Sequence, residues 1–478
     1  MARLPSAITL LLLTCGVTAG AQSAPPAPDK VWHAPAEQGL SRELAARPEK
    51  TYQIDTTHSY SLAELIDLSQ RHNPETRASW ELARVRADEL GIARSQLYPT
   101  LAAVALAASS RQAALLSEYF ARQTVGVFEP QLHVTWLIFD GGARSGEIDI
   151  AKANLLAANV AFNDTHRKLI YLVASAYYHL LNARGQLEAA DASLKNAQAV
   201  EDQVHSRLDN GLATRPDLLE ATAARAQAEY DLAAATGAEG IAHGDLATAM
   251  GLPPQTQFAV EGIDKLRTPA SMADSVDEEI DRAFAQRPEL LTQVTRLRAA
   301  NASIKVARSA YIPSLGLTGD GGLARAYGEL NQLPRTYAQG EVWDAGLELR
   351  WTLFDGLRRE REMARAQAEK KAAEAGIDAL RDQVSNEVWA SYTNMQTALH
   401  QQQAAAALLT SSGEAYDAAR ESYGYGVRNI IDVIAAQKSL AQARSEDVFA
   451  RTQLLLQSAT LAFRTGDLIQ IPPGKGTP

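Results

Sequence analysis

The stretch 132–141 reads LHVTWLIFDG, and the stretch 347–356 reads LELRWTLFDG. From the first Leu up to the Phe-Asp-Gly end, every second residue is apolar in both stretches. A period of two places alternate side chains on opposite faces of a β-strand. Glu348 and Arg350 cannot share an apolar medium with Leu347 and Trp351. One face of such a strand is therefore apolar and the other faces water. The Asp-Gly pair then ends each strand.

The two stretches belong to a repeat that runs from near residue 61 to near residue 466. A shift of about 214 residues aligns Asn73-Pro74-Glu75 with Arg287-Pro288-Glu289, and after one inserted residue Gly211 aligns with Gly426. Ordered matches over this length indicate a tandem duplication of one unit rather than several unrelated domains.

The repeat and its flanks predict five parts. They are a signal peptide at 1–21, an extended proline-rich arm at 22–58, a first structural repeat at 59–265, a second at 266–468 and a C-terminal tail at 469–478.

The N-terminus has the features of a secretory signal. Arg3 supplies a positive charge, residues 8–18 form a short apolar core, and Ala-Gly-Ala precedes Gln22. Cys15 keeps a second interpretation open. It follows Leu-Leu-Thr, which resembles a bacterial lipobox although Thr14 departs from it, so Cys15 could instead carry a lipid anchor.

Composition excludes several classes of protein. The chain has 478 residues, a formal net charge of -10, one Cys and a mean hydropathy of -0.20. One Cys excludes a disulfide framework and a Cys-based zinc site, and the acidic balance argues against nucleic-acid binding. After the N-terminus no apolar run is long enough for a membrane-spanning helix, whereas alternating strands barely raise the mean hydropathy. The His residues lack metal-ligand spacing and no nucleophile motif occurs, so we expect no catalytic residue, metal or cofactor, and hence no enzyme.

Each half is predicted to fold in the same order: a helix, a strand, a polar loop of roughly 20 residues, the second strand quoted above, a very long helix, a tight turn and a return helix. Gly319–Gly322 is interpreted as part of the polar loop. For the first and then the second half, the expected ranges are 61–97 and 275–311 for the first helix, 100–110 and 314–324 for the first strand, 143–209 and 357–422 for the long helix, and ends near 251 and 466 for the return helix.

The long helices and the few strands predict an oligomer. At 1.5 Å per residue each long helix spans about 100 Å, and an Ala-rich hairpin of this length cannot stabilise itself. Four strands cannot close a barrel, which needs about eight. Several chains would therefore share one barrel and one helical tube, and three chains would supply twelve strands.

In this order and in both halves, the motifs resemble those of the outer-membrane efflux protein family, the TolC- and OprM-like channels. The motifs are Phe139-Asp140-Gly141-Gly142, Phe354-Asp355-Gly356, Asn210-Gly211-Leu212-Ala213-Thr214 with Asp217-Leu218-Leu219, and Tyr423-Gly424-Tyr425-Gly426-Val427-Arg428 with Ile431-Asp432-Val433.

The resemblance implies a mainly α fold with a small transmembrane β part. A homotrimer would form a 12-stranded β-barrel, four strands from each chain, in the lipid of the outer membrane of a Gram-negative bacterium. A long periplasmic α-helical barrel would continue it. The implied partners are a periplasmic adaptor protein and an inner-membrane pump, and no nucleic acid.

The resemblance also implies a gate at the helix turns. An Asp beyond the first tip bonds to a Tyr and an Arg at the second tip and holds the channel shut, and the matching residues are Asp217, Tyr423 and Arg428. Pro216 departs from the family, which has a Thr there that helps to bind the Arg. The alternative role is a surface ion pair of little energy, ~0–1 kcal/mol.

Two further roles follow from the same resemblance. Asp432 would contribute to an acidic ring lining the pore entrance, although Ala435 replaces a second Asp of the family; the alternative is an Asp that only satisfies a helix dipole. Adaptor contact is expected at the helix tips, where the glycines could also serve turn geometry alone. The expected contact residues are Gly211, Leu212, Ala213, Thr214, Gly426 and Val427.

The leading functional hypothesis is a passive trimeric conduit from the periplasm to the exterior, opened by the adaptor and the pump, for small-molecule efflux. The alternative is the outer-membrane channel of a type I protein secretion system, because the pump selects the cargo. A periplasmic coiled-coil structural protein without a pore is the third hypothesis. Loose apolar periodicity in the long helices and the amphipathic strands argue against it.

Overall fold

The computed structural model describes residues 28–29, 31, 33, 37–46, 52, 54–116, 119–266, 268–269, 271, 275–330 and 334–468. The chain divides into two compact units, residues 1–53 and residues 54–478. The predicted signal peptide 1–21 with its Cys15, and the tail 469–478, lie outside the described residues.

In the smaller unit, α1 (Glu37–Ala45) is a helix, so the expectation of an extended arm over 22–58 is wrong for this segment. Its nine residues include neither Pro nor a β-branched residue, and Pro35 and Pro48 stand outside it. The Glu37 carboxylate lies 2.8 Å from His33 Nδ1, in the first turn where a negative charge suits the helix dipole.

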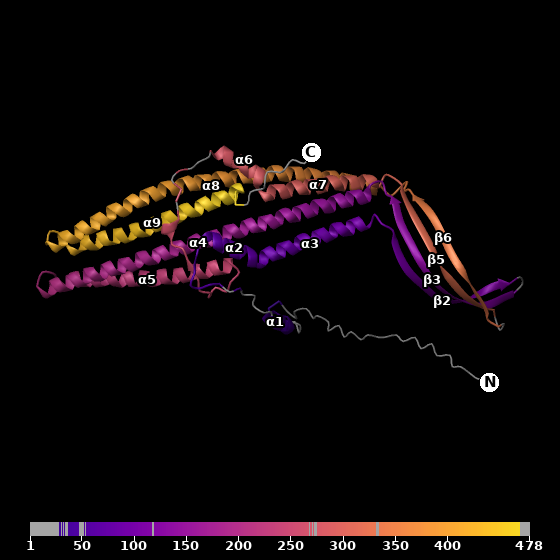
Figure 1. Cartoon of the computed structure of the whole chain (residues 1–478), viewed down its shortest axis with the longest axis horizontal. Coiled ribbons are helices and arrows are strands. Elements are labelled where there is room, and N and C mark those ends of the chain that lie inside the picture. The colour runs from indigo at the N-terminus through magenta and orange to yellow at the C-terminus, as the bar shows by residue number, and fades with distance from the viewer. Residues whose placement is uncertain are drawn as a thin grey trace, which may run out of the picture. The chain divides into compact units, whose positions relative to one another are not determined.

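The larger unit is built around two helical hairpins. α4 (Ala143–Asp209) turns back as α5 (Arg215–Ala249), and α8 (Arg358–Gly424) turns back as α9 (Ile430–Thr465). The four helices lie along one another, with both turns at the end away from the strands (Figure 1). α4 and α8 have 67 residues each, which confirms the predicted long helices. Within the described ranges, no helix combines the length and the hydropathy that crossing a membrane requires.

Shorter helices precede the strands in two pairs. α2 (Leu62–His72) and α3 (Pro74–Ser95) replace the single helix expected over 61–97, and α6 (Val276–Gln286) and α7 (Pro288–Ser309) replace the one expected over 275–311. Each break falls at the residue before Pro, which has extended backbone because the proline ring disfavours helical geometry there. The proline then begins the next helix, where its missing N–H is not needed.

Four long strands form one antiparallel sheet in the order β2-β3-β5-β6. They are β2 (Thr100–Leu116), β3 (Tyr119–Phe139), β5 (Ser314–Leu330) and β6 (Thr336–Arg350). The first strand of each half is longer than expected, and strand residues replace the roughly 20-residue loops. The added residues lack a clear apolar alternation, which is the pattern that predicts a strand. A separate two-stranded parallel sheet joins β1 (Ser59–Tyr60) to β4 (Ala259–Val260), and the short 3-10 turn Ile263–Lys265 follows.

The interpretation of Gly319–Gly322 as a loop is wrong, because these residues lie inside β5. A Cβ at Gly322 would collide with the carbonyl oxygen of Pro130, so the absent side chain lets β3 and β5 approach. Likewise, the ring of Tyr327 covers Gly126 on the neighbouring strand. The glycines therefore allow close strand pairing instead of ending it.

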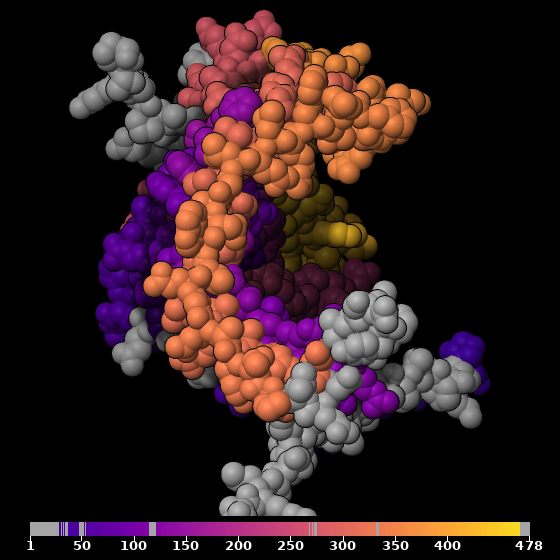
Figure 2. All heavy atoms as spheres, turned by 90° about the vertical axis from the view of Figure 1, so that its right-hand side faces the viewer, coloured from indigo at the N-terminus to yellow at the C-terminus, as the bar shows by residue number. Residues whose placement is uncertain are grey.

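The register confirms the alternation inferred from the sequence as far as Arg350, where β6 ends; Trp351 and Leu353, expected in the strand, lie beyond it. His133 pairs with Asp320 and Asp320 with Asp344, so these polar residues share one face. On the opposite face Leu132 and Trp343 flank Gly321, and both are exposed. From the strand end, the orange residues of β5 and β6 follow a curved arc, with the yellow α9 behind it (Figure 2). The sheet therefore presents one apolar and one polar face.

A buried ionic network joins the hairpins to α7. Arg167 of α4 is 1% exposed and donates to Glu289 of α7 and to the Phe463 carbonyl of α9. Arg287, also buried, pairs with Glu289 and, at 2.8 Å, with Glu387 of α8. Burial raises the pKa of Glu289, but the hydrogen bond from Arg287 and the charges of both arginines outweigh burial and lower it to about 2. Each buried ion depends on its partners, so the network fixes the four helices together.

Candidate functional site

Both hairpin turns use the same backbone geometry. Gly211 after α4 has φ +74°, and Gly426 after α8 has φ +77°. In each turn the N–H of the residue after the Gly donates to a carbonyl of the last helical turn, at 2.8 and 2.9 Å. This pattern satisfies carbonyls at the helix end and needs a left-handed residue, which Gly adopts without steric cost. Turn geometry alone therefore accounts for both glycines.

The return helices begin with different caps. At α5, Asp217 Oδ2 accepts from the N–H and the hydroxyl of Thr214, both at 2.7 Å, in a capping box. At α9, Asn429 caps the helix by accepting from the N–H of Asp432 at 2.9 Å. Among the described residues the Asp432 carboxylate itself has no hydrogen bond or ion pair. Asp217 thus caps α5 through one carboxylate oxygen. The carboxylate of Asp432 is not used in the cap of α9.

The two tips share one apolar core. Its buried members come from all four long helices and are Val200, Val204, Ala221, Tyr416, Ala419, Tyr423, Ile430, Val433 and Leu440. Ala213 and Leu218 pack against this tip core. The turn of the first half and the turn of the second half are therefore held together by burial of apolar surface.

Arg207 crosses from the first tip to the second, and the sequence did not single it out. Its guanidinium carbon lies 4.6 Å from the centroid of the Tyr423 ring. Its Nη1 donates to the carbonyl oxygens of Tyr423, at 2.7 Å, and Gly424, at 3.2 Å. These are carbonyls of the last turn of α8, where a cation is favourable. One side chain of α4 therefore stacks on the ring of α8 and caps its end.

The structure brings only part of the predicted gate together within one chain. Burial raises the pKa of the Tyr423 hydroxyl, the Arg207 charge opposes this, and the Asp217 carboxylate is near enough to add to the rise. The Tyr423 hydroxyl and the Arg428 side chain make no hydrogen bond within the described part of the chain. Asp217 is bonded to Thr214 instead. The contacts expected between Asp217, Tyr423 and Arg428 are thus not formed in a single chain.

The expected adaptor-contact residues divide into two kinds. Leu212 and Val427 are 67% and 79% exposed. Tyr425, which was not selected from the sequence, lies in the same turn as Val427 and is 78% exposed. Ala213 packs into the tip core and Thr214 caps α5. The outward apolar surface at the tips is therefore formed by Leu212, Tyr425 and Val427.

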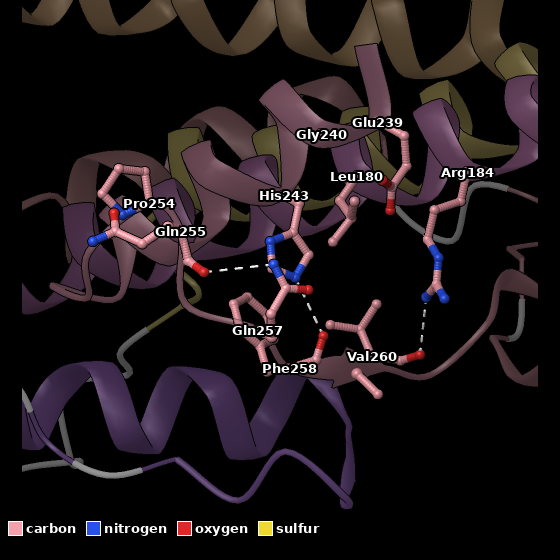
Figure 3. A pocket seen from close by; sticks show the side chains of 11 residues that line it. Leu180, Arg184, Glu239, Gly240, His243, Pro254, Gln255, Gln257, Phe258 and Val260 are labelled. Carbon is pink, nitrogen blue, oxygen red and sulfur yellow. Dashed lines mark hydrogen bonds between the residues drawn. The ribbon is translucent and has the colours of Figure 1, made fainter. Parts of the chain in front are cut away.

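A polar cavity of about 420 Å³ lies in the first half between α4, α5 and residues 254–260. His243 Nε2 donates to the Phe258 carbonyl and Arg184 Nη1 to the Val260 carbonyl, each at 3.2 Å (Figure 3). The imidazole of His243 and the guanidinium of Arg184 thus bind the backbone of the segment that contains β4. In the part of the chain that the structure describes, no group of His, Cys, Asp and Glu could bind a metal ion.

Comparison with known proteins gives consistent matches over both halves. A family model described as outer membrane efflux protein matches residues 65–252 and 280–467. Protein CyaE of Bordetella pertussis is 27% identical over 422 residues, which cover 87% of this chain and 85% of the relative. The pyoverdine export outer membrane protein OpmQ of Pseudomonas putida is 27% identical over 481 residues, 96% of each chain.

Solved structures have the same fold. The Campylobacter jejuni CmeC outer membrane channel superposes with a TM-score of 0.72 at 18% identity, over 88% of this chain and 93% of that one.

Proposed function

The chain belongs to the outer membrane efflux protein family, and from this premise we propose that it is the outer-membrane channel of a tripartite export system. It is a passive conduit from the periplasm to the exterior, and small molecules are its cargo. Family membership places it in the outer membrane, with the long helices in the periplasm.

The four-stranded sheet carries the proposal. Its exposed apolar face suits lipid, and its opposite face bears His133, Asp320 and Asp344, which suit a water-filled lumen. Four strands leave two open edges, at β2 and β6, and open edges are not tolerated in lipid. Three copies would close a twelve-stranded barrel and bring three pairs of hairpins into one tube.

The tandem duplication of 59–265 and 266–468 is part of the same proposal. It is supported by the equal lengths of β2 and β5, 17 residues each, and of α4 and α8, 67 residues each. The separate family match in each half also supports it. Both halves would thus contribute equivalent pairs of strands and helices to the assembled channel.

The gate of the proposed channel lies between copies of the chain. Asp217 uses only Oδ2 for its cap, so Oδ1 remains available to Arg428 of a second copy. We expect Asp217→Ala combined with Arg428→Ala to raise the resting conductance in planar lipid bilayers, with Thr214→Ala as the control for loss of the cap. Equal conductance of the double variant and wild type would refute the gate. In the same recordings, Asp432→Asn should lower the preference for cations.

The outward tip residues fit docking of a periplasmic adaptor, which links the channel to an inner-membrane pump. Leu212, Tyr425 and Val427 form an exposed apolar group at the end farthest from the strands. Exchanging Leu212 and Val427 for Asp should abolish adaptor binding in a pull-down from detergent extract and leave the trimer intact. The control is the same exchange at Tyr230, an exposed residue of α5 that is far from the turn in sequence. Tyr230→Asp should leave adaptor binding unchanged.

Deletion of the encoding gene tests the export function. The deletion strain should become more susceptible to a panel of toxic small molecules, and plasmid expression of the chain should restore resistance. A strain with unchanged susceptibility that no longer secretes one particular protein would favour the type I secretion channel instead. Unchanged susceptibility with unchanged secretion would contradict both.

A further inference from the structure

We propose that the outward face of the β-sheet, the face that carries Leu132 and Trp343, binds the phosphates of an outer-leaflet glycolipid. Three guanidinium groups form the site, those of Arg111, Arg325 and Arg335. The site rests on the proposed barrel, because the apolar part of this face must lie in lipid. The ligand is lipopolysaccharide, the glycolipid of the external leaflet, whose sugars carry phosphate groups.

The position of the arginines along the strands matches the outer boundary of the lipid. On β3 the exposed apolar face runs from Trp136 through Leu132 to Phe128, nine residues along one strand. A tilted strand crosses the hydrocarbon layer with about 9–11 residues. Phe128 pairs with Arg325, and Thr124, four residues farther along, pairs with Arg111. Because the helices lie at the opposite end of the sheet (Figure 1), this boundary is the external one.

A tyrosine ring holds one of the three guanidinium groups against the sheet. The ring of Tyr327 crosses β3 above Gly126, where a Cβ would collide with it, and its hydroxyl lies 3.1 Å from Ser109 Oγ of β2. The guanidinium carbon of Arg335 lies 4.8 Å from the centroid of this ring, and its Nε donates to Glu329 at 3.0 Å. The cation–π contact and the carboxylate thus fix Arg335 on the outward face.

The other two guanidinium groups have unused donors at the same place. Arg111 Nε donates to Thr124 Oγ1 at 3.0 Å, on the strand residue two before Gly126. Within the described part of the chain, the terminal nitrogens of Arg111 make no hydrogen bond, and the side chain of Arg325 makes neither a hydrogen bond nor an ion pair. The paired N–H groups of a guanidinium match two oxygens of one phosphate.

The spacing favours a head group with more than one phosphate. β3 separates the strands of Arg111 and Arg325, and the two residues differ by four positions along it. At about 4.8 Å per strand and 3.4 Å per residue, their Cα atoms are roughly 17 Å apart. Separate phosphates would therefore meet the two side chains, as lipopolysaccharide provides and a phospholipid with a single phosphate does not.

The charge on the two faces of the distal sheet is unequal. Beyond the apolar part, the described outward face has four arginines against Glu329 and Glu341, although the whole chain has a net charge of -10. The inward face of the same rows has Glu129 and, among the described residues, no Lys or Arg. Cations gathered beside a lipid surface attract anionic head groups. The arginines are Arg111, Arg122, Arg325 and Arg335.

Native mass spectrometry of the purified full-length protein, titrated with rough lipopolysaccharide, measures the binding. Exchanging Arg111, Arg325 and Arg335 together for Gln should weaken it roughly 100-fold, because each guanidinium near an anionic lipid contributes about fivefold. Tyr327→Leu should have an intermediate effect, since it keeps every charge and removes the ring under Arg335. Lipopolysaccharide from which the phosphates have been removed should bind wild type as weakly as the intact form binds the triple variant.

Arg350→Gln is the matched control. Arg350 lies on the inward face of the same sheet, with Nη2 2.6 Å from Glu348 Oε1, and its exchange should leave lipid binding unchanged. If the triple variant does not assemble, Arg325→Gln alone decides, because it removes no bond within the described chain and should weaken binding about fivefold. Wild-type affinity of these arginine variants would overturn the site. Equal affinity of wild type for phosphatidylglycerol would overturn the assignment to a glycolipid.

Conductance in planar bilayers separates this site from the proposed function. Phosphate-dependent binding by a protein that does not conduct would retain the lipid site and contradict the channel. A conducting protein whose lipid binding does not depend on phosphate would contradict the lipid site and retain the channel.

Discussion

The helix break of the first half and that of the second half have the same geometry and different side chains. Asn73 caps α3 by accepting from the Glu75 N–H at 2.7 Å. Arg287 stands at the equivalent place, makes no side-chain cap and instead pairs with Glu289 and Glu387. The tips differ in the same way, because Arg207 has a Ser as its counterpart.

This comparison separates two kinds of position. The residues that both halves keep, such as the prolines at the breaks and Gly211 with Gly426, set backbone geometry. The residues that differ take part in contacts between the halves: Arg207 reaches α8, and Arg287 shares Glu289 of its own half with Arg167 of α4. A repeated chain thus acquires a defined internal order through its departures from the repeat.

The largest expected effect is on stability, and it compares the residue before the proline at the two helix breaks. Arg287→Ala should lower the free energy of unfolding by about 3 kcal/mol, because two partly buried carboxylates, those of Glu289 and Glu387, each lose one of their two cations. Asn73→Ala should cost only about 1 kcal/mol, the value of a lost cap. Denaturant titration in detergent, followed by tryptophan fluorescence, measures both. Equal losses would contradict the distinction between a local cap and a shared ionic network.

The dependence of stability on pH provides a second comparison of the two helix breaks. The folded-state pKa of Glu289 is lowered to about 2 from its ordinary value of 4.5, so its stabilising contribution is present above pH 4.5 and is lost as the pH falls toward 2. The shift corresponds to about 3 kcal/mol. Glu289→Gln should remove this part of the acid sensitivity, whereas the counterpart Glu75→Gln should not. Identical acid profiles of both variants and wild type would contradict the ionic network.

The smallest effect concerns the turns between strand and long helix. Gly142 and Leu357 occupy the same place before α4 and α8, with φ +96° and +67°. A left-handed Leu costs about 1–2 kcal/mol, and Leu357 is 57% exposed and buries little. Leu357→Gly should therefore raise the melting temperature slightly, and Gly142→Leu should lower it. A lower melting temperature for Leu357→Gly would show that the Leu side chain has a packing role.

Much of the fold could be predicted because its signals are periodic. The alternation around Trp136 and the unbroken run of α4 are local features of the sequence. The break at Asn73 was missed although Pro74 marks it, because the helical composition on both sides outweighed the proline. The distal strands were missed because Gly, Ala and polar residues interrupt the apolar alternation there, which hides the period of two.

The site could be predicted only where the family motif defines it. Asp217, Tyr423 and Arg428 were selected by resemblance, yet within one chain Asp217 caps a helix and Tyr423 meets Arg207. The Arg207 contact depends on two helices from different halves, and no local pattern encodes such a meeting. Its one sequence signal is a mismatch, because Arg207 aligns with Ser422 in an otherwise well-matched turn.

The length of the strands has a consequence for how cargo leaves the cell. β2 has 17 residues, which span about 58 Å, whereas a tilted strand crosses the hydrocarbon layer with about 9–11 residues. The distal part carries a polar row across the strands, with Arg111 bonded to Thr124 and Arg335 to Glu329. In the proposed trimer these residues form a stiff hydrophilic collar that begins at the lipid head groups. An apolar solute is then released into bulk water at a distance from the outer leaflet. This distance slows its return into the membrane that it has just crossed.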